Sequence, residues 1–169
     1  DEYARVSERY GFLTEQRDDV EKAKRELLDI ISQITREMKD IFIREFKEID
    51  RSFRETFLEL FGGGRAALIL EDEDNVLDCG IEVKVQPPGK ALSTLSLLSG
   101  GEKAFVAIAL YYAIIKVHPT PFCVMDEIEA ALDDVNVIRS AEYMRTLTKN
   151  TQFIVITHRR GTMEQADVL

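Results

Sequence analysis

The sequence contains no tryptophan, only two cysteines and no long apolar run among its 169 residues. No apolar stretch approaches the ~20 residues that a helix needs to cross a bilayer, so we expect neither a transmembrane segment nor a membrane partner. Cys79 and Cys123 both lie in apolar stretches typical of strands, which favours buried free thiols in a reducing compartment over a disulfide. The expected location is therefore the cytoplasm.

Basic residues are also scarce, because 22 Lys and Arg face 31 Asp and Glu and leave a formal net charge of -9. Attraction to nucleic-acid phosphates needs clustered basic residues, which argues against a simple basic nucleic-acid binder. A glycine-rich phosphate loop ending in Gly-Lys-Ser/Thr is missing as well. The triple glycine at 62–64 does not supply one, because no Lys-Ser/Thr follows it. The pair Gly89 and Lys90 does not either, because it lacks the upstream glycine and the following hydroxyl residue.

What is present begins with a helix pattern from Val6 to about Leu60, where apolar residues recur at alternating steps of three and four. No proline and only one glycine, Gly11, interrupt this stretch. The pattern predicts a long helix with a heptad seam and a charged outer face. Because the sequence begins inside this charged helix pattern, we expect it to be part of a longer protein.

The seam changes character along the helix. Residues 1–34 carry few apolar positions beyond the seam, so they are expected to need an external partner helix. After Met38, steps of four residues predominate, which would unwind a supercoil. For residues 36–60 two interpretations stay open: continuation of a coiled-coil arm, or an amphipathic helix that packs on its own domain.

The triple glycine at 62–64 is expected to end the helix, because glycine adopts the left-handed conformation at little steric cost. Residues 66–70 and 81–86 then read as two strands around an acidic turn at 71–75. Alternation of apolar and polar residues in the second strand predicts one buried face and one wet face. We therefore divide the chain into an arm and neck helix, residues 1–60, and a lobe, residues 61–169.

A helix over residues 101–116 is predicted from a capping box formed by Ser99 and Glu102 and from apolar residues at helical spacing. Gly100 and Gly101 at its start are unfavourable by roughly 1 kcal/mol each relative to alanine in a helix interior, so they need a reason. Small residues at a helix N-terminus let a phosphate approach the free N–H groups, with the Ser99 hydroxyl as a further donor. An ordinary capped helix is the alternative interpretation.

Residues 122–125 form a short apolar run that ends in Asp126 and Glu127, as in a buried parallel strand that carries carboxylates to the ligand-binding edge of a sheet. There Asp126 would hold Mg²⁺ through water, and Glu127 would position or deprotonate an attacking water. A second strand over 152–156 follows a helix over 134–149 and delivers His158 to the same kind of edge. The alternative for each motif alone is a loop, a cap or a structural histidine.

Together these motifs resemble the C-terminal half of an ABC-type ATPase head from the structural maintenance of chromosomes family, in its bacterial branch. Residues 98–103 are similar to the ABC signature motif, 122–127 to the Walker B strand with its catalytic glutamate, 131–133 to the D-loop, and His158 to the switch histidine. The resemblance is close over about 92–169 and architectural before that. It implies an α/β fold, the C-terminal lobe of a P-loop NTPase head with an N-terminal coiled-coil helix.

The resemblance also implies a mechanism, in which two heads sandwich two ATP molecules. Ser99, Gly100 and Gly101, with Glu102 in the same motif, would cap the ATP held by the Walker A loop of the opposing head. Asp126 would bind Mg²⁺, Glu127 would activate water, Asp133 would communicate across the dimer, and His158 would steady the γ-phosphate. This chain by itself is expected to be inactive, since the Walker A loop belongs to an N-terminal lobe that the sequence lacks.

The implied partners are the N-terminal head lobe, a second head in an ATP-dependent homodimer, a kleisin subunit, and DNA bound without sequence preference by the full complex. The kleisin would place its winged-helix domain on the head and its helices on the neck, with helix 42–60 and hairpin 66–86 as candidate contacts. The implied role is chromosome condensation and segregation at the nucleoid. Two alternatives remain: a DNA-repair ATPase with coiled-coil arms, and a non-enzymatic kleisin-docking module; an ABC transporter is disfavoured by the long seam.

Overall fold

The computed structural model describes residues 1–91 and 93–169, which form two compact units, Asp1–Ile43 and Arg44–Leu169. Leu92, where the close resemblance was expected to begin, lies outside the described residues. The predicted long helix is confirmed as α1, Glu2–Phe61. Within the first unit its seam residues are exposed, for example Val20 at 68% and Leu27 at 60%, so they are free to bury against another helix.

The last turns of α1 belong to the second unit and pack inside it. Phe53 and Phe57 are fully buried, and the Ser52 hydroxyl donates to the carbonyl of Ala113 at 3.0 Å. Asp50 accepts a hydrogen bond from the backbone N–H of Leu68 at 2.7 Å. These contacts favour the interpretation of an amphipathic helix on its own domain for the last turns of α1, and the second compact unit begins at Arg44.

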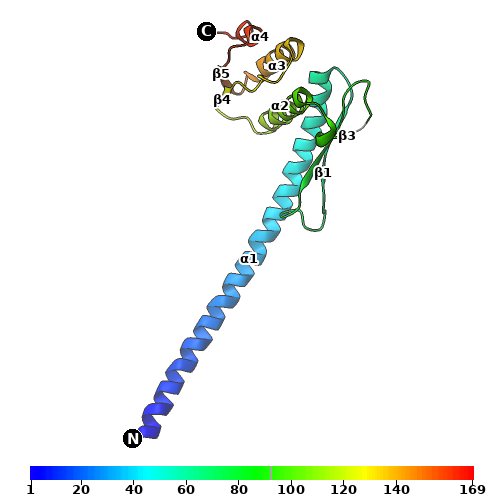
Figure 1. The fold of residues 1–169 in the computed structure, drawn as a ribbon. Helices are drawn as coiled ribbons and strands as arrows, with labels where there is room; N and C mark the ends of the chain where they lie inside the picture. The colour runs from blue at the N-terminus through cyan, green and yellow to red at the C-terminus, as the bar shows by residue number, and fades with distance from the viewer. Residues whose placement is uncertain (92) are drawn as a thin grey trace. The chain divides into compact units, whose positions relative to one another are not determined.

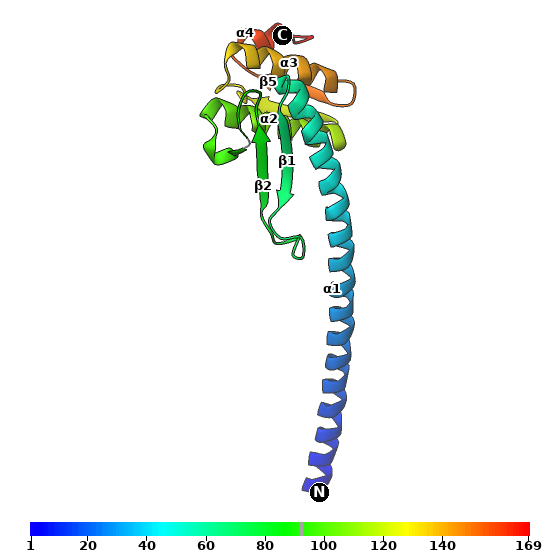
Figure 2. The same ribbon diagram turned by 90° about the vertical axis from the view of Figure 1, so that its right-hand side faces the viewer.

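Glycines end α1 and bring a hairpin close to it, as Figure 2 shows. Gly62 has φ 68°, in the left-handed region, and a Cβ on Gly64 would lie 2.2 Å from the carbonyl oxygen of Gln86. Strands β1 (Arg65–Leu70) and β2 (Ile81–Gln86) pair antiparallel with Ala66 opposite Val85. These two residues are buried, so the predicted buried face is confirmed at this end of the hairpin, whereas Ile81 at the other end, expected on the same face, is 47% exposed.

The remaining elements were predicted closely, apart from three short ones. Strand β3 (Ser93–Thr94) extends the hairpin to three strands in the order β1-β2-β3, and the 3-10 helix η1 (Leu95–Leu97) follows it. Helix α2 (Gly100–Val117) leads to strand β4 (Phe122–Asp126), helix α3 (Asp134–Leu147), strand β5 (Gln152–Ile156) and the short helix α4 (Arg160–Met163). Strands β4 and β5 pair in parallel, with Val124 opposite Ile154.

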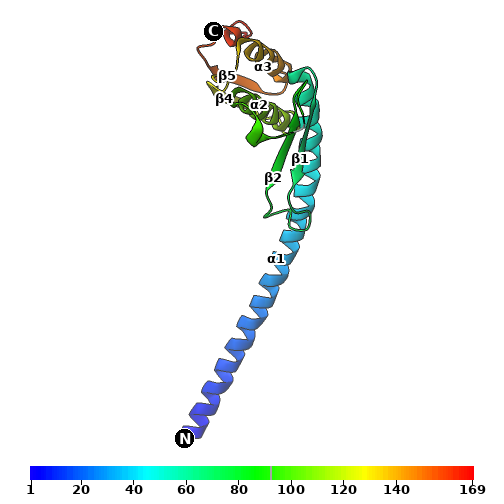
Figure 3. The same ribbon diagram turned by 45° about the vertical axis from the view of Figure 1, so that its right-hand side comes forward.

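Helix α2 forms the centre of the second unit, between the hairpin and the β4–β5 pair (Figures 1 and 3). Its buried side chains, including Phe105 and Tyr112, share one core with Phe53 and Phe57 of α1 and Met125 of β4. Each large apolar side chain in such a core contributes about 1.5–3 kcal/mol by leaving water. This core joins α2 to β4, and Phe153 and Val155 of β5 pack against it.

The two cysteines differ from expectation in one respect. Both are free, and Cys123 in β4 is buried, but Cys79 lies in the loop before β2 and is only half-buried. The apolar neighbours of Cys79 in sequence suggested a strand, whereas backbone hydrogen bonds from Asp78 and Cys79 to Asn75 make a turn there. None of the helices formed by residues 1–91 and 93–169 combines the length and apolar character of a membrane span.

Candidate functional site

The start of α2 is built by the predicted capping box, which is confirmed. The Ser99 side chain accepts from the backbone N–H of Glu102, and the Glu102 carboxylate accepts from the backbone N–H of Ser99 at 3.1 Å. Lys90 forms an ion pair with the other Glu102 oxygen at 2.7 Å. The hydrogen bond from Lys90, followed by the one from the Ser99 N–H, lowers the pKa of Glu102 below its ordinary value. Glu102 therefore stabilises the helix start through the chain's own residues.

The two glycines at this helix start have different surroundings. A Cβ on Gly101 would lie 2.9 Å from the carbonyl oxygen of Ala131, closer than backbone contacts allow, whereas one on Gly100 would meet no described atom within 4 Å. The close approach that Gly101 requires is thus to the chain's own segment after β4, and only Gly100 faces open space. Gly101 therefore packs α2 against the loop that precedes α3.

The ends of β4 and β5 bring together the residues predicted to act in catalysis. Asp126 and Ile156 are paired as the last residues of two parallel strands, so the residues that follow them emerge at one edge. Nδ1 of His158 lies 3.0 Å from Oε1 of Glu127. Their side chains are 64% and 53% exposed, so the edge is open to a ligand or to another protein surface.

The backbone of Glu127 is strained. Its φ of 47° places it in the left-handed region, which costs a residue with a side chain on the order of 1–3 kcal/mol. Two hydrogen bonds maintain this conformation: the Glu127 N–H donates to the carbonyl of Ile156 at 2.9 Å, and the Ala130 N–H donates to the carbonyl of Glu127 at 3.0 Å. In this conformation the Glu127 carboxylate lies within hydrogen-bonding distance of His158.

Asp133 begins α3 as its N-cap. Its carboxylate accepts from the backbone N–H of Asn136 at 2.8 Å and from the Asn136 side-chain amide at 3.1 Å. The residue is exposed. Its contacts within the chain are those of a helix cap, and a role across a dimer stays a prediction.

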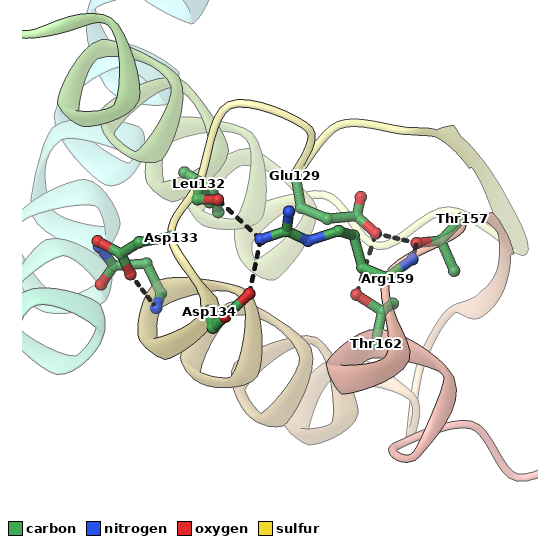
Figure 4. Close-up of polar contacts among 8 residues, drawn as sticks. Glu129, Leu132, Asp133, Asp134, Thr157, Arg159 and Thr162 are labelled. Carbon is green, nitrogen blue, oxygen red and sulfur yellow. Dashed lines mark hydrogen bonds and ion pairs between the residues drawn. The ribbon is translucent and has the colours of Figure 1, made fainter.

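Sequence reasoning missed a buried polar network that lies behind this edge, shown in Figure 4. Glu129 is 3% exposed, and one of its carboxylate oxygens accepts from the hydroxyls of Thr157 and, at 3.0 Å, of Thr162. Arg159 donates to the carbonyl of Leu132 at 2.9 Å. Because Glu129 follows Asp126 and Glu127 in an acidic stretch, its sequence context resembles that of an exposed carboxylate. Its burial has no local signal.

The donor set suits a shared metal site better than a self-contained one. Residues 1–91 and 93–169 place no three His, Cys, Asp or Glu side chains together as a metal cluster would. Mg²⁺, however, is usually held by one or two protein carboxylates together with phosphate oxygens and water. Asp126, exposed at the end of β4, fits that requirement as one protein carboxylate that could hold the ion through water. A phosphate-bearing molecule would have to supply other ligands.

The long helix and this mixed unit match solved structures of the head regions of SMC proteins, which gives the class of the fold. One solved structure of that class, an Smc head domain with an extended coiled coil bound to the C-terminal domain of ScpA from Pyrococcus furiosus, matches with a TM-score of 0.77 at 42% identity, over 96% of this chain and 41% of that chain. A second, from a study of ATP-driven dimerization and DNA-stimulated activation of SMC ATPases, matches with a TM-score of 0.70 at 45% identity, over 76% of this chain and 78% of that chain.

The chain belongs to the RecF/RecN/SMC N terminal domain family, whose model matches residues 6–169. Among curated relatives, the chromosome partition protein Smc of Bacillus subtilis (strain 168) is 54% identical over all 169 residues. The chain spans 14% of the length of that relative.

Proposed function

We propose that this chain is the C-terminal half of an SMC ATPase head, which hydrolyses ATP only when an N-terminal lobe and a second head complete its site. The observation that carries the proposal is the contact of Glu127 with His158 at the shared end of β4 and β5, in a chain without a phosphate loop. A water-activating carboxylate and a histidine form one half of a phosphoryl-transfer site. The other half must come from elsewhere.

The uncovered face of the β4–β5 pair supports an absent lobe. Phe122 and Val124 are 60% and 54% exposed, and Ile154 and Ile156 are 48% and 54% exposed. All four alternate with buried or half-buried neighbours on one side of two parallel strands. Parallel strands are found almost only in sheets covered on both faces, so further strands or helices are expected to pack here. The N-terminal lobe is the proposed cover.

In the assembled head, Glu127 would accept the proton of the attacking water, and His158 would hold the Glu127 carboxylate and contact the terminal phosphate. Asp126 would hold Mg²⁺ through water, and the ion would supply positive charge that offsets the charge of the phosphates. Ser99 and Gly100 would face the ATP of the opposing head, since a capped helix N-terminus with a small open residue is suited to bind phosphate. Asp133, at the start of α3, would contact the opposing head and so couple the two ATP sites across the dimer.

We also propose that the whole protein binds a kleisin and entraps DNA to condense and segregate chromosomes. The Smc head from Pyrococcus furiosus bound to ScpA supports the first part, and the chromosome partition relative supports the second. Helix 42–60, one candidate contact for the kleisin, offers only part of its surface, because the chain itself buries Phe53 and Phe57. A partner on the neck must therefore use the outer face of α1 or its exposed residues before Arg44.

The decisive experiment is Glu127→Gln in the full-length protein that contains this chain. The substitution keeps size and hydrogen bonding but removes the base, so turnover should fall by about 10²–10⁴-fold while ATP-dependent head association persists. Glu164→Gln, which changes an exposed glutamate paired with Arg160, is the matched control and should leave turnover unchanged. Turnover in Glu127→Gln equal to that of an active wild type would refute the role of Glu127, whereas absence of turnover in both proteins would favour a docking module that is not an enzyme.

A further inference from the structure

Glu129 connects three separate segments around the Glu127–His158 pair. It lies in the loop after β4, whereas its partner Thr157 directly follows β5 and its partner Thr162 lies in α4 (Figure 4). Both hydroxyls donate to the same carboxylate oxygen. A carboxylate that is 3% exposed has a large desolvation cost unless such bonds compensate it, so these segments are held together.

Arg159 adds a second connection between the same loops. Its guanidinium donates to the carbonyl of Leu132 at 2.9 Å and to the carboxylate of Asp134 at 3.0 Å. Its backbone N–H donates to the Thr157 hydroxyl at 2.9 Å. Thr157 therefore bonds to both Glu129 and Arg159. His158 lies between Thr157 and Arg159 in the sequence.

The Glu127–His158 contact is too exposed to maintain its own geometry. Both side chains are more than half exposed, and ion pairs or hydrogen bonds in that setting contribute only about 0–1 kcal/mol. Hydrogen bonds to a buried charged group are stronger, about 1.5–3 kcal/mol each. The buried network is thus the part of the loop pair able to determine where His158 lies relative to Glu127.

We propose that Glu129, with the hydroxyls of Thr157 and Thr162, is a positioning network that holds His158 within hydrogen-bonding distance of Glu127 in the catalytic geometry. This inference rests on the proposed ATPase function. The network acts through the spacing of the two loops, and none of its three members needs to contact the nucleotide. Loss of either hydroxyl would leave the Glu129 carboxylate short of a donor and free the loop that carries His158.

The test is Thr162→Val in the full-length protein, which removes one hydroxyl from a buried residue while keeping its shape. With loosened positioning, kcat should fall about tenfold, and the KM for ATP and ATP-dependent head association should stay unchanged. Thr162→Ser restores the hydroxyl and should return kcat to near the wild-type value. Thr56→Val is the matched control, because Thr56 is also buried and its hydroxyl pairs with that of Tyr143 at 2.9 Å, in α1 rather than at the strand edge.

A double-mutant cycle separates positioning from general stability. In a His158→Ala background, Thr162→Val should cause no further loss of kcat, because the residue it positions is gone. A loss that multiplies with that of His158→Ala, or an equal loss in Thr56→Val, would show a merely structural effect and overturn the inference. If Thr162→Val fails to fold, Thr157→Val at the half-buried position gives the same test. Absence of ATP hydrolysis in the wild type would refute the proposed function, whereas active wild type with unchanged Thr162→Val would refute this inference alone.

Discussion

The start of α2 and the shared end of β4 and β5 are both proposed to face nucleotide, but the chain builds them differently. Ser99 and Glu102 bond to each other across three residues, within one helical turn. At the strand edge, Glu127 contacts His158 across 31 residues, and Glu129 contacts Thr162 across 33. The first arrangement is local and can form with its helix. The second exists only once β4, β5 and α4 have assembled, so substitutions should affect the two places differently.

The largest effect is expected at the start of α2, where a substitution of Ser99 can change the charge while a side-chain cap is kept. Ser99→Asp keeps a side-chain acceptor at the N-cap, although it loses the hydroxyl that donates to Oε2 of Glu102 at 3.0 Å. It also sets a negative charge toward the phosphate of the opposing head. Juxtaposed like charges cost several kcal/mol, so ATP-dependent head association should weaken by more than about 100-fold. Ser99→Asn, a neutral cap of the same shape, is the control. Sedimentation with and without ATP measures the association; equal behaviour of the two variants would contradict phosphate binding at Ser99.

The next effect concerns Gly101, where the start of α2 contacts the loop after β4. Gly101→Ala should destabilise the protein by about 1–3 kcal/mol, because its Cβ would lie 2.9 Å from the carbonyl oxygen of Ala131. Gly100→Ala should be neutral or stabilising, since alanine favours helix and the position is open. Urea denaturation of both variants checks the contrast. The same stability in both would mean that α2 does not approach the loop after β4.

The two neighbouring arginines after β5, Arg159 and Arg160, test how the loops after β4 and β5 are joined. Arg159→Ala should cost about 1–3 kcal/mol, because it removes the donor to the Leu132 carbonyl and the partner of Asp134. Arg160→Ala should stay within about 0.5 kcal/mol, since Arg160 forms an exposed pair with Glu164 in the same short helix. Thermal unfolding compares them. Similar losses would show that the loops after β4 and β5 are not joined by Arg159.

The smallest effect is expected from Lys90, whose contact with Glu102 is exposed. Lys90→Met should change stability by less than about 1 kcal/mol and should raise the pKa of Glu102 toward its ordinary value, because the Lys90 hydrogen bond is the main cause of its lowering. A lowered carboxyl pKa stabilises the fold above the unfolded-state pKa, and that contribution is lost as the pH falls through the folded-state pKa. Nuclear magnetic resonance titration of Glu102 measures the shift. Lys84→Met, at a pair within β2, should not move it.

Residues whose interactions are local could be predicted from the sequence. The capping box at Ser99, the end of α1 at the triple glycine and the strand over residues 81–86 all follow from spacing within a few residues. The convergence of Glu127 and His158 was also foreseen, because parallel strands end at one edge. The burial of Glu129 was not foreseen, because the sequence does not distinguish buried Glu129 from exposed Glu127. The sequence also left open whether residues 36–60 pack on their own domain, as the last turns of α1 do.

By itself, the sequence determined the long helix, the helix and strand order and the residue types at the ends of β4 and β5, because these depend on periodicity, capping and turn residues close together along the chain. Only the tertiary structure decided which side of α1 is covered, that Gly101 is needed for contact with Ala131, and that Glu129 and Arg159 connect the two loops. Burial and long-range hydrogen bonds depend on which segments meet in space, and nothing in the sequence near Glu129 or Thr162, 33 positions apart, indicates that these two residues meet.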